Sequence, residues 1–538
     1  MKNLKRLMPF AFLAALAAPL AAGCTVADDA LQGEEDDLTS VTARERNLSF
    51  EGYVSVSATA GDWEIKSAVT AETKSAFGAL RTASIGVNDR ELKDVDIKTF
   101  VKEKVTVVGA NGTKSDALRV RYRYNDRALV PVAMATRSAI SLAVLAGNYQ
   151  SQSKRILQEC TENGPHDQEF EGSIWYVFNP SLSSCTTAVK AEEQKIQEAR
   201  KSLTDPQNQV VALEQSRLYL PVTVKLEGGS TSSSNTYPEY DRLWRGGVQQ
   251  NKLVISLVSG VMADWAAGEK PKLADDIGYH MFYQQMQEIQ KQLPGLKLTS
   301  TGGVDLTKFT ANGKTVTGVK WTDLMNWELN GSGFPAAFQS WTDQQALKIV
   351  VADTLARHWL TFEQPVSVKI GSEAARNVTV VIKTYYGAET DDTPHRTAMK
   401  TSDVVVYNGH SYIGYGPLDP SRYSAADFPS SYQLFFFNSC VSFNYYEADF
   451  FKMHSGGSKN LDMITNGLES WVNGSGPSIG RFIATLLNGK QASYLDLLNV
   501  TAKGAPSTDV GIDGLRVVDG ELDNKFKPAS TKITVTLK

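Results

Sequence analysis

Hydrophobic and polar residues alternate from residue 46 to about residue 135, as in LSFEGYVSVSA, VKEKVTVVG and ALRVRYRYN. Glycine and asparagine separate these stretches, as they commonly do between strands. A period of two predicts strands, so we expect a β-rich domain over residues 46–136. From residue 137 the apolar spacing becomes helical, and the Gly/Ser-rich sequence EGGSTSSSNTYPEY predicts a linker or an exposed loop up to residue 240.

Strands and helices alternate in the sequence after residue 240. Near-continuous apolar runs predict strands that are buried on both faces, at 252–260, 377–387, 403–407, 432–437 and, more weakly, 461–465. Helical stripes predict helices at 277–293, at 342–359 after a T-x-x-Q capping box, and at 479–487. This alternation is typical of a parallel sheet covered by helices.

The last residues, TKITVTLK, alternate again and predict a strand that closes the sheet edge or pairs with the N-terminal domain. The sequence therefore predicts a multidomain α+β protein. Its expected parts are a β-rich domain (46–136), a helical segment (137–240), an α/β domain with a mostly parallel sheet (241–505) and C-terminal strands (506–538).

The first 24 residues have the pattern of an export signal. Basic residues precede an apolar run over residues 7–20, which is too short to span a bilayer comfortably. The run leads into PLAAGC, which resembles the lipobox of bacterial lipoprotein signal peptides. The resemblance implies that Cys24 is lipidated and becomes the mature N-terminus. The alternative is an ordinary secretory signal that is cut in the same Ala-rich stretch.

Residues 25–45 begin with the acidic sequence TVADDALQGEEDDLTS, which is poor in large apolar residues and predicts a disordered tether. Several acyl chains on Cys24 would anchor such a tether stably in a lipid bilayer. In the resembled system, Thr25 after the cysteine favours the outer membrane over the inner membrane. We therefore expect a lipid-anchored protein of the bacterial cell envelope.

Charge and motifs exclude several classes of function. The chain has 55 basic and 59 acidic residues and no basic block, which argues against nucleic acid as a partner. Neither an H-E-x-x-H nor a C-x-x-C motif occurs, and no Gly-rich phosphate-binding signature is present. We therefore expect neither a metal site nor a cofactor.

The four cysteines are Cys24, Cys160, Cys185 and Cys440. The export signal implies a compartment that permits disulfides. Cys160 and Cys185 enclose a short segment, and we predict a disulfide between them, worth about 3 kcal/mol in the chain-entropy model. Cys440 then has no predicted partner within the chain. It is paired between chains, buried and inert, or reactive.

His410 and Cys440 follow two successive predicted strands, in VVVYNGHS and LFFFNSC. Functional groups gather at the carboxyl ends of strands in open α/β sheets. If these strands are parallel neighbours about 4.8 Å apart, both side chains lie at one edge of the sheet. A thiolate is a nucleophile, and an adjacent imidazole lowers its pKa and then protonates the leaving group.

These two motifs resemble the histidine and cysteine motifs of the caspase-like (clan CD) cysteine peptidases, with the gingipains and clostripain as the nearest match. The resemblance covers residues 250 to 500. It implies a caspase-like fold, peptide or protein substrates, Cys440 as nucleophile, His410 as general acid/base, and the backbone N–H groups of Ser411 and Cys440 as an oxyanion hole. The family usually has glycine after the histidine, where this chain has Ser411. Asp462 and Glu469 are candidates for binding a basic substrate residue.

Three simpler interpretations stay open. Cys440 can be a buried cysteine that packs as a small hydrophobe, and His410 a loop histidine. The protein would then be a non-catalytic surface or periplasmic lipoprotein that acts as a binding or scaffolding module. The aromatic clusters at 175–178, 279–283 and 443–451 either form core or line a peptide or glycan groove. The remaining histidines, at 166, 280, 358, 395 and 454, suggest no competing site.

Overall fold

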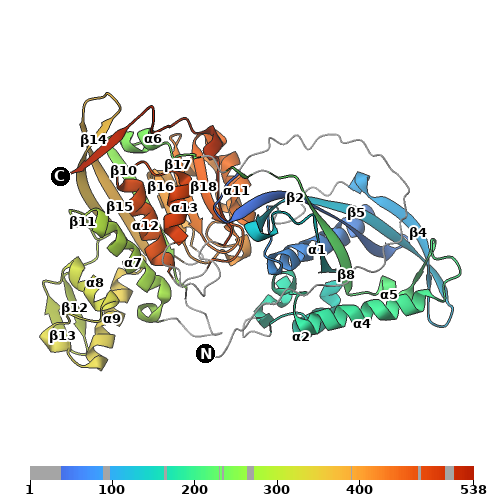
Figure 1. The fold of residues 1–538 in the computed structure, drawn as a ribbon. Helices are drawn as coiled ribbons and strands as arrows, with labels where there is room; N and C mark the ends of the chain where they lie inside the picture. The colour runs from blue at the N-terminus through green and yellow to red at the C-terminus, as the bar shows by residue number, and fades with distance from the viewer. Residues whose placement is uncertain are drawn as a thin grey trace. The chain divides into compact units, whose positions relative to one another are not determined.

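The structure is a computed structural model that describes residues 38–88, 97–162, 167–229, 231–232, 235–262, 272–388, 391–470, 474–502 and 514–538. The predicted signal peptide, Cys24 and most of the predicted tether lie outside the described residues. The described residues belong to one unit, which contains two large β-sheets and a small two-stranded sheet (Figure 1). The predicted multidomain α+β fold class is confirmed.

The N-terminal sheet is a half-barrel with strand order β6-β8-β2-β5-β4-β7, and β3 pairs with β5. Strand β2 pairs with β5 along all of its 15 residues. Alternate residues of β2, such as Leu48 and Phe50, share a buried core with Ile65 and Val69 of helix α1. The strands and helix are β2 (Ala43–Ser57), α1 (Asp62–Thr82), β3 (Gly86–Val87), β4 (Val101–Val108), β5 (Lys114–Pro131), β6 (Ala139–Leu145), β7 (Gln209–Val211) and β8 (Tyr219–Glu227).

Ordered structure begins before residue 46, the predicted end of the tether. Strand β1 (Leu38–Thr39) pairs with β19 and with β9 (Thr231–Ser232), and β2 already begins at Ala43. The tether prediction was wrong for these residues because their partners lie in β5, β9 and β19, more than 80 residues away, and local composition does not reveal such pairing.

Helices form much of the segment between β6 and β8, but the segment predicted as helical, residues 137–240, also contains the strands β6, β7, β8 and β9. These strands pair with one another or with strands outside the segment, which periodicity alone does not reveal. Helices α2 (Ser153–Glu159), α3 (Ile174–Val177) and α4 (Ser183–Arg200) lie here, followed by the short α5 (Ala212–Gln215). The predicted disulfide between Cys160 and Cys185 is confirmed, with 25 residues of sequence separation and both cysteines fully buried. It ties the end of α2 to the first turn of α4.

The C-terminal sheet has the order β11-β14-β15-β10-β16-β17-β18-β19-β1-β9. Its centre, from β15 to β18, is parallel, and β14 and β19 flank this centre in the antiparallel sense. Strand β20 also pairs with β14, so the predicted C-terminal strand closes the sheet edge. The strands are β10 (Lys252–Gly260), β11 (Lys297–Ser300), β14 (Trp359–Ile370), β15 (Arg376–Ala388), β16 (Val404–Asn408), β17 (Gln433–Asn438), β18 (Leu461–Asn466), β19 (Arg516–Asp519) and β20 (Ile533–Leu537).

Helices cover both faces of this parallel centre, which explains its near-continuous apolar strands. Val404 and Val406 belong to the core that contains α7 and α12, whereas Val405 and Tyr407 belong to the core that contains α10 and α11. The second of these cores also includes the N-terminal sheet and α1. The helices are α7 (Ile277–Gln292), α10 (Thr393–Thr401), α11 (Ser442–Met453), α12 (Ser475–Leu487) and α13 (Tyr494–Ala502).

The helix predicted at 342–359 is shorter than expected. Helix α9 spans Trp341–Leu355, and its N-cap is Ser340, whose Oγ accepts from the Asp343 N–H. The T-x-x-Q motif lies inside the helix and does not cap it. Trp359 instead begins strand β14, because the neighbouring strand β15 supplies backbone partners that periodicity alone does not reveal.

The three aromatic clusters are mostly core. Trp175 and Tyr279 are almost fully buried, as are Tyr445 and Phe450 of α11. They therefore do not form an exposed glycan groove in this structure.

We predict that replacing both Cys160 and Cys185 with serine lowers the free energy of unfolding by about 3 kcal/mol, because the unfolded chain gains the freedom of a 25-residue loop. Urea denaturation of the wild-type protein and the double variant measures this difference. Wild-type protein with a reductant is the control and should match the variant. A difference below about 1 kcal/mol would contradict the entropic account.

Candidate functional site

The carboxyl ends of β16 and β17 lie side by side. The two strands are parallel, and their last residues, Asn408 and Asn438, are opposite each other. His410 and Cys440 each lie two residues beyond this pair, so they leave the sheet at the same level. Neighbouring strands are about 4.8 Å apart, and both residues are partly exposed. The predicted adjacency of the two strands is confirmed.

The parallel strands are arranged in the doubly wound order. Numbered along the chain as β10, β15, β16, β17 and β18, they lie in the sheet as 2-1-3-4-5. The order reverses between β10 and β16, and ligands of open α/β sheets bind beyond the carboxyl ends of strands at such a switch point. His410 therefore follows the strand at the switch point, and Cys440 follows the next strand.

Backbone strain is concentrated just after each of these two residues. Tyr412 and Ile413 have φ of 50° and 54°, and Val441 has φ of 54°. A β-branched residue in the left-handed region is an outlier that costs about 1–3 kcal/mol. The Tyr446 hydroxyl donates to the Ser411 carbonyl oxygen at 2.9 Å, which holds one strained turn in place. Strain of this kind is typical of functional loops.

Position 409, just before His410, requires a glycine because the Tyr407 side chain lies against it. A Cβ added to Gly409 would lie 2.3 Å from the Tyr407 hydroxyl oxygen. That hydroxyl donates to the His410 carbonyl oxygen at 2.8 Å. Gly409 thus lets Tyr407 fold back and fix the histidine backbone. Ser411, the residue after His410, is buried.

A buried amide and guanidinium network joins the strand ends beneath His410 and Cys440. Asn438 donates to Asn408 Oδ1 at 2.8 Å and accepts from Arg516 Nη2 at 2.9 Å. Arg516 Nε donates to Asn466 Oδ1 at 3.0 Å. These residues end β16, β17 and β18 and begin β19. The sequence analysis missed this network, although an asparagine follows each of the three apolar strand runs.

Opposing effects act on the Cys440 thiol. Burial raises the pKa of Cys440, whereas the charge of Arg81 lowers it. The thiol donates to the Ser470 carbonyl oxygen at 3.8 Å. Cys440 also lies two residues before helix α11, whose N-terminal dipole favours a thiolate. Burial dominates, so the pKa of the resting thiol is above its ordinary value.

The two candidate carboxylates lie in different places. Asp462 is the second residue of β18, at the amino end of the strand, and is fully buried. It accepts hydrogen bonds from Tyr432 (2.5 Å), Tyr494 and Asn524 (2.5 Å), and burial raises its pKa to about 7. Asp462 is therefore a core residue at the opposite end of the strand from Cys440. Glu469 follows the carboxyl end of β18 and contacts Arg81.

The other histidines do not assemble a second site. His395 is buried against Tyr407, and burial lowers its pKa to about 4. His280 Nδ1 lies 3.1 Å from Glu328 on a neighbouring helix. His166 is outside the described residues. Across the described ranges, no group of three or more His, Cys, Asp or Glu residues is arranged to hold a metal ion.

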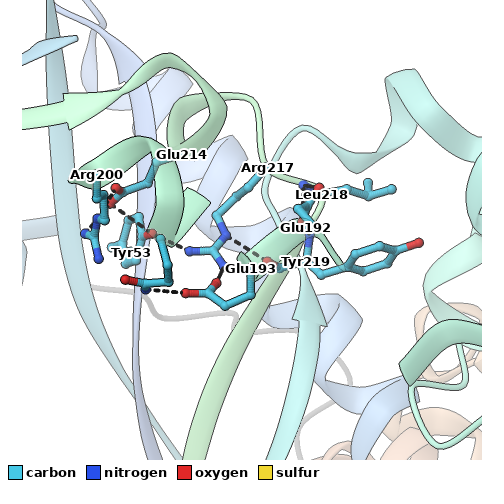
Figure 2. Close-up of polar contacts among 9 residues, drawn as sticks. Tyr53, Glu192, Glu193, Arg200, Glu214, Arg217, Leu218 and Tyr219 are labelled. Carbon is cyan, nitrogen blue, oxygen red and sulfur yellow. Dashed lines mark hydrogen bonds and ion pairs between the residues drawn. The ribbon is translucent and has the colours of Figure 1, made fainter. Parts of the chain in front are cut away.

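A second polar cluster lies in the N-terminal half of the chain, where α4 and α5 meet β2 and β8 (Figure 2). Arg217 donates to the Tyr53 hydroxyl at 2.7 Å and to Glu193 at 2.6 Å. Arg200 donates to both carboxylate oxygens of Glu214, at 2.9 and 3.0 Å. The side chains satisfy one another, so this cluster joins the helices to the sheet.

A cavity of about 140 Å³ lies beside this cluster. Its lining includes Glu72 of α1, whose pKa burial raises to about 8. The Tyr122 hydroxyl donates to Glu72 at 2.7 Å. Ligand pockets are typically about 300–1,000 Å³, so this cavity is small for an organic substrate. Periodicity did not single out Glu72, because it lies on an ordinary amphipathic helix.

No protein-family model, curated protein sequence or solved structure matches this chain.

We predict that Asn438→Leu lowers the free energy of unfolding by about 3 kcal/mol, because it removes the buried hydrogen bonds that Asn438 makes to Asn408 Oδ1 and Arg516 Nη2. Urea unfolding measures the change. The matched control is Asn377→Leu, the same replacement at an exposed strand position, which should change stability by less than about 0.5 kcal/mol. Equal effects of the two substitutions would show that the network does not stabilise the strand ends.

We also predict a pH dependence from Asp462. Its folded-state pKa of about 7 exceeds the ordinary value of 3.8. The folded protein therefore keeps a proton that the unfolded chain releases, and stability falls as pH rises between these values. Compared with Asp462→Asn, the wild-type protein should lose about 1 kcal/mol more per pH unit between about pH 5 and about pH 7. Urea unfolding at several pH values measures both slopes.

Asp353→Asn, on the exposed side of α9, is the control and should keep the wild-type slope. Parallel slopes for the wild-type protein and Asp462→Asn would mean that Asp462 titrates at its ordinary pKa.

Proposed function

We propose that this protein is an exported, lipid-anchored cysteine peptidase that resembles the caspase-like group and hydrolyses peptide bonds of a peptide or protein substrate. Cys440 is the nucleophile and His410 the general acid/base. The observation that carries the proposal is the register of β16 and β17, which are parallel neighbours with Asn408 opposite Asn438. His410 and Cys440 each follow this pair by two residues, which supports their assignment as a catalytic pair at one edge of the sheet.

The reaction proceeds through an acyl-enzyme. His410 takes the proton of the Cys440 thiol, and the resulting thiolate attacks the carbonyl carbon of the scissile peptide bond and forms a C–S bond. The C–N bond then breaks, and His410 gives its proton to the leaving amine. Water, deprotonated by His410, hydrolyses the thioester and releases the acid and the thiol. The N–H groups of Ser411 and Cys440 would donate to the oxyanion of each tetrahedral intermediate.

The location belongs to the same proposal. The signal pattern and the lipobox-like PLAAGC support lipidation of Cys24 and anchoring in the cell envelope, with the outer membrane favoured. The Cys160–Cys185 disulfide fits an extracytoplasmic compartment. Among the helices that the structure describes, none is long and apolar enough to cross a membrane.

One observation favours a second candidate function, a non-catalytic binding or scaffolding module. Burial raises the pKa of Cys440 above its ordinary value, whereas an active nucleophile usually has a lowered pKa. Ser411 at the glycine position of the resembled family points the same way. The two functions differ in whether His410 changes the reactivity of Cys440.

We predict that His410→Ala slows alkylation of Cys440 by iodoacetamide about tenfold at pH 7. The loss occurs because the imidazole no longer favours the thiolate. The pH profile of the rate separates the thiolate fraction from access, because access sets the height of the profile and the thiol pKa sets its midpoint. The full chain is alkylated between about pH 6 and about pH 10. Mass spectrometry of the Cys440 peptide then measures the rates.

His280→Ala removes another partly exposed histidine, on α7, and should leave the rate unchanged. Identical pH profiles for wild-type protein and His410→Ala would favour the binding module.

A further inference from the structure

The last turn of α1 reaches the edge of the C-terminal sheet that carries Cys440. Arg81, one residue before the end of α1, forms an ion pair with Glu469, in the segment that follows β18. The side chains are 16% and 35% exposed, so the pair is largely removed from solvent. Glu469 immediately precedes Ser470, whose carbonyl oxygen accepts from the Cys440 thiol.

Arg81 is also held from the side by helix α3. Its Nη2 donates to the Tyr176 carbonyl oxygen at 2.5 Å, and its guanidinium lies 4.5 Å from the centroid of the Tyr176 ring. Three contacts thus fix one side chain: an ion pair, a hydrogen bond and a cation–π contact. Because the contacts with Tyr176 already hold the Arg81 guanidinium in place, it loses little further side-chain entropy when it binds the Glu469 carboxylate.

Electrostatics place the same side chain next to the thiol. Burial raises the pKa of the Tyr176 hydroxyl. The positive charge of Arg81 lowers this pKa, and the charge of Cys440 raises it. Burial likewise raises the pKa of Tyr445, on α11. Here too Arg81 lowers the pKa and Cys440 raises it. Arg81, Cys440 and the two tyrosines therefore form one neighbourhood, with side chains from α1, α3 and α11.

The surrounding packing makes this contact part of a close-fitting interface. A Cβ added to Gly86 would lie 2.3 Å from the Gly467 carbonyl oxygen. Asn444 of α11 donates to the Val87 carbonyl oxygen at 3.0 Å. The segment from Gly467 to Ser470 is thus pressed between the N-terminal elements and Cys440. A substrate that approaches the thiol along this side meets α1 and α3.

We propose that Arg81 is an internal latch: by binding Glu469 it holds the N-terminal domain over Cys440 and keeps the site closed until this contact is released. The inference rests on the proposed function for its biological meaning, because a closed thiol matters only if the thiol reacts. The contact itself is a property of the fold and can be tested without any substrate.

Removal of Arg81 changes the alkylation rate of Cys440 in opposite directions if Arg81 acts by closing the site or only by its charge. The charge of Arg81 lowers the pKa of Cys440, so its loss alone would leave less thiolate and slow alkylation. If Arg81 closes the site, its removal instead exposes the thiol and speeds alkylation. Iodoacetamide is a suitable probe because it is small and uncharged, so the charges of Arg81 and Glu469 do not steer its approach.

The experiment compares rates of Cys440 alkylation by iodoacetamide in the full chain, read from the mass of the Cys440 peptide. We expect Arg81→Ala to raise the rate about tenfold. The matched control is Arg119→Ala, because Arg119 pairs with Glu103 in the same domain at similar exposures of 10% and 33%. It should stay within about twofold of the wild-type rate.

A charge reversal guards against simple loosening of the fold. Arg81→Glu should open the site through repulsion from Glu469. The double variant Arg81→Glu with Glu469→Arg restores an ion pair of opposite sense and should return alkylation to within about threefold of the wild-type rate. Failure of this restoration, an unchanged or slower rate in Arg81→Ala, or an equal increase in Arg119→Ala would each overturn the latch.

The latch and the proposed function fail separately. His410→Ala in the Arg81→Ala background tests the dyad with the site open. If Arg81→Ala speeds alkylation and the added His410→Ala has no effect, the latch stands and the peptidase proposal fails. If His410→Ala slows alkylation in both backgrounds while Arg81→Ala gives no acceleration, the dyad stands and the latch fails.

Discussion

The parallel pairing of β16 with β17 is the constraint on which the candidate site depends. Both strands are buried on both faces, and their side chains alternate between two different cores. A slip by one residue would exchange these faces. It would also separate Asn408 from Asn438, and Asn408 Oδ1 would lose the amide hydrogen bond that it accepts in this register. The level at which His410 and Cys440 leave the sheet is therefore determined by packing and by buried hydrogen bonds together.

The N-terminal half of the chain is part of this constraint. The core beneath α11 continues into the half-barrel, so that Phe77 of α1 and Tyr445 of α11 lie in one cluster, with ring centroids 6.1 Å apart. Because apolar burial is the main favourable term in folding, the two halves stabilise each other. The surroundings of Cys440 then include residues from both halves, and access to the thiol depends on how tightly they pack.

The thiol is subject to three competing influences. Burial raises its pKa and dominates, while the helix α11 N-terminus and the charge of Arg81 favour the thiolate. Burial penalises the charged form of a thiol. Release of the proposed Arg81–Glu469 latch would admit more water to Cys440 and reduce this penalty.

The sequence by itself determined the local features. Alternation located β2, β4, β5 and β20, and apolar runs located the parallel strands β10 and β15 to β18, whereas β6, β8, β14 and β19 were not located. The runs before His410 and Cys440 predicted their place at adjacent strand ends. Cysteine spacing predicted the disulfide. These features follow from side-chain periodicity and from short-range geometry, which are both readable along the chain. The extent of α9, the strand at residues 38–39 and the buried position of Asp462 were not readable, because each depends on a partner that is distant in sequence.

Only the tertiary structure decided which distant side chains meet. Arg516 reaches the asparagines at two strand ends, Glu72 is buried beneath β2, and Arg81 meets Glu469 across almost 400 residues of sequence. A charged residue on an amphipathic helix such as α1 is most often solvated, and nothing local distinguishes Arg81 from its neighbours. Its role follows from how α1 packs on the C-terminal sheet, because long-range packing and desolvation, and not local pattern, determine where a charge finds its partner.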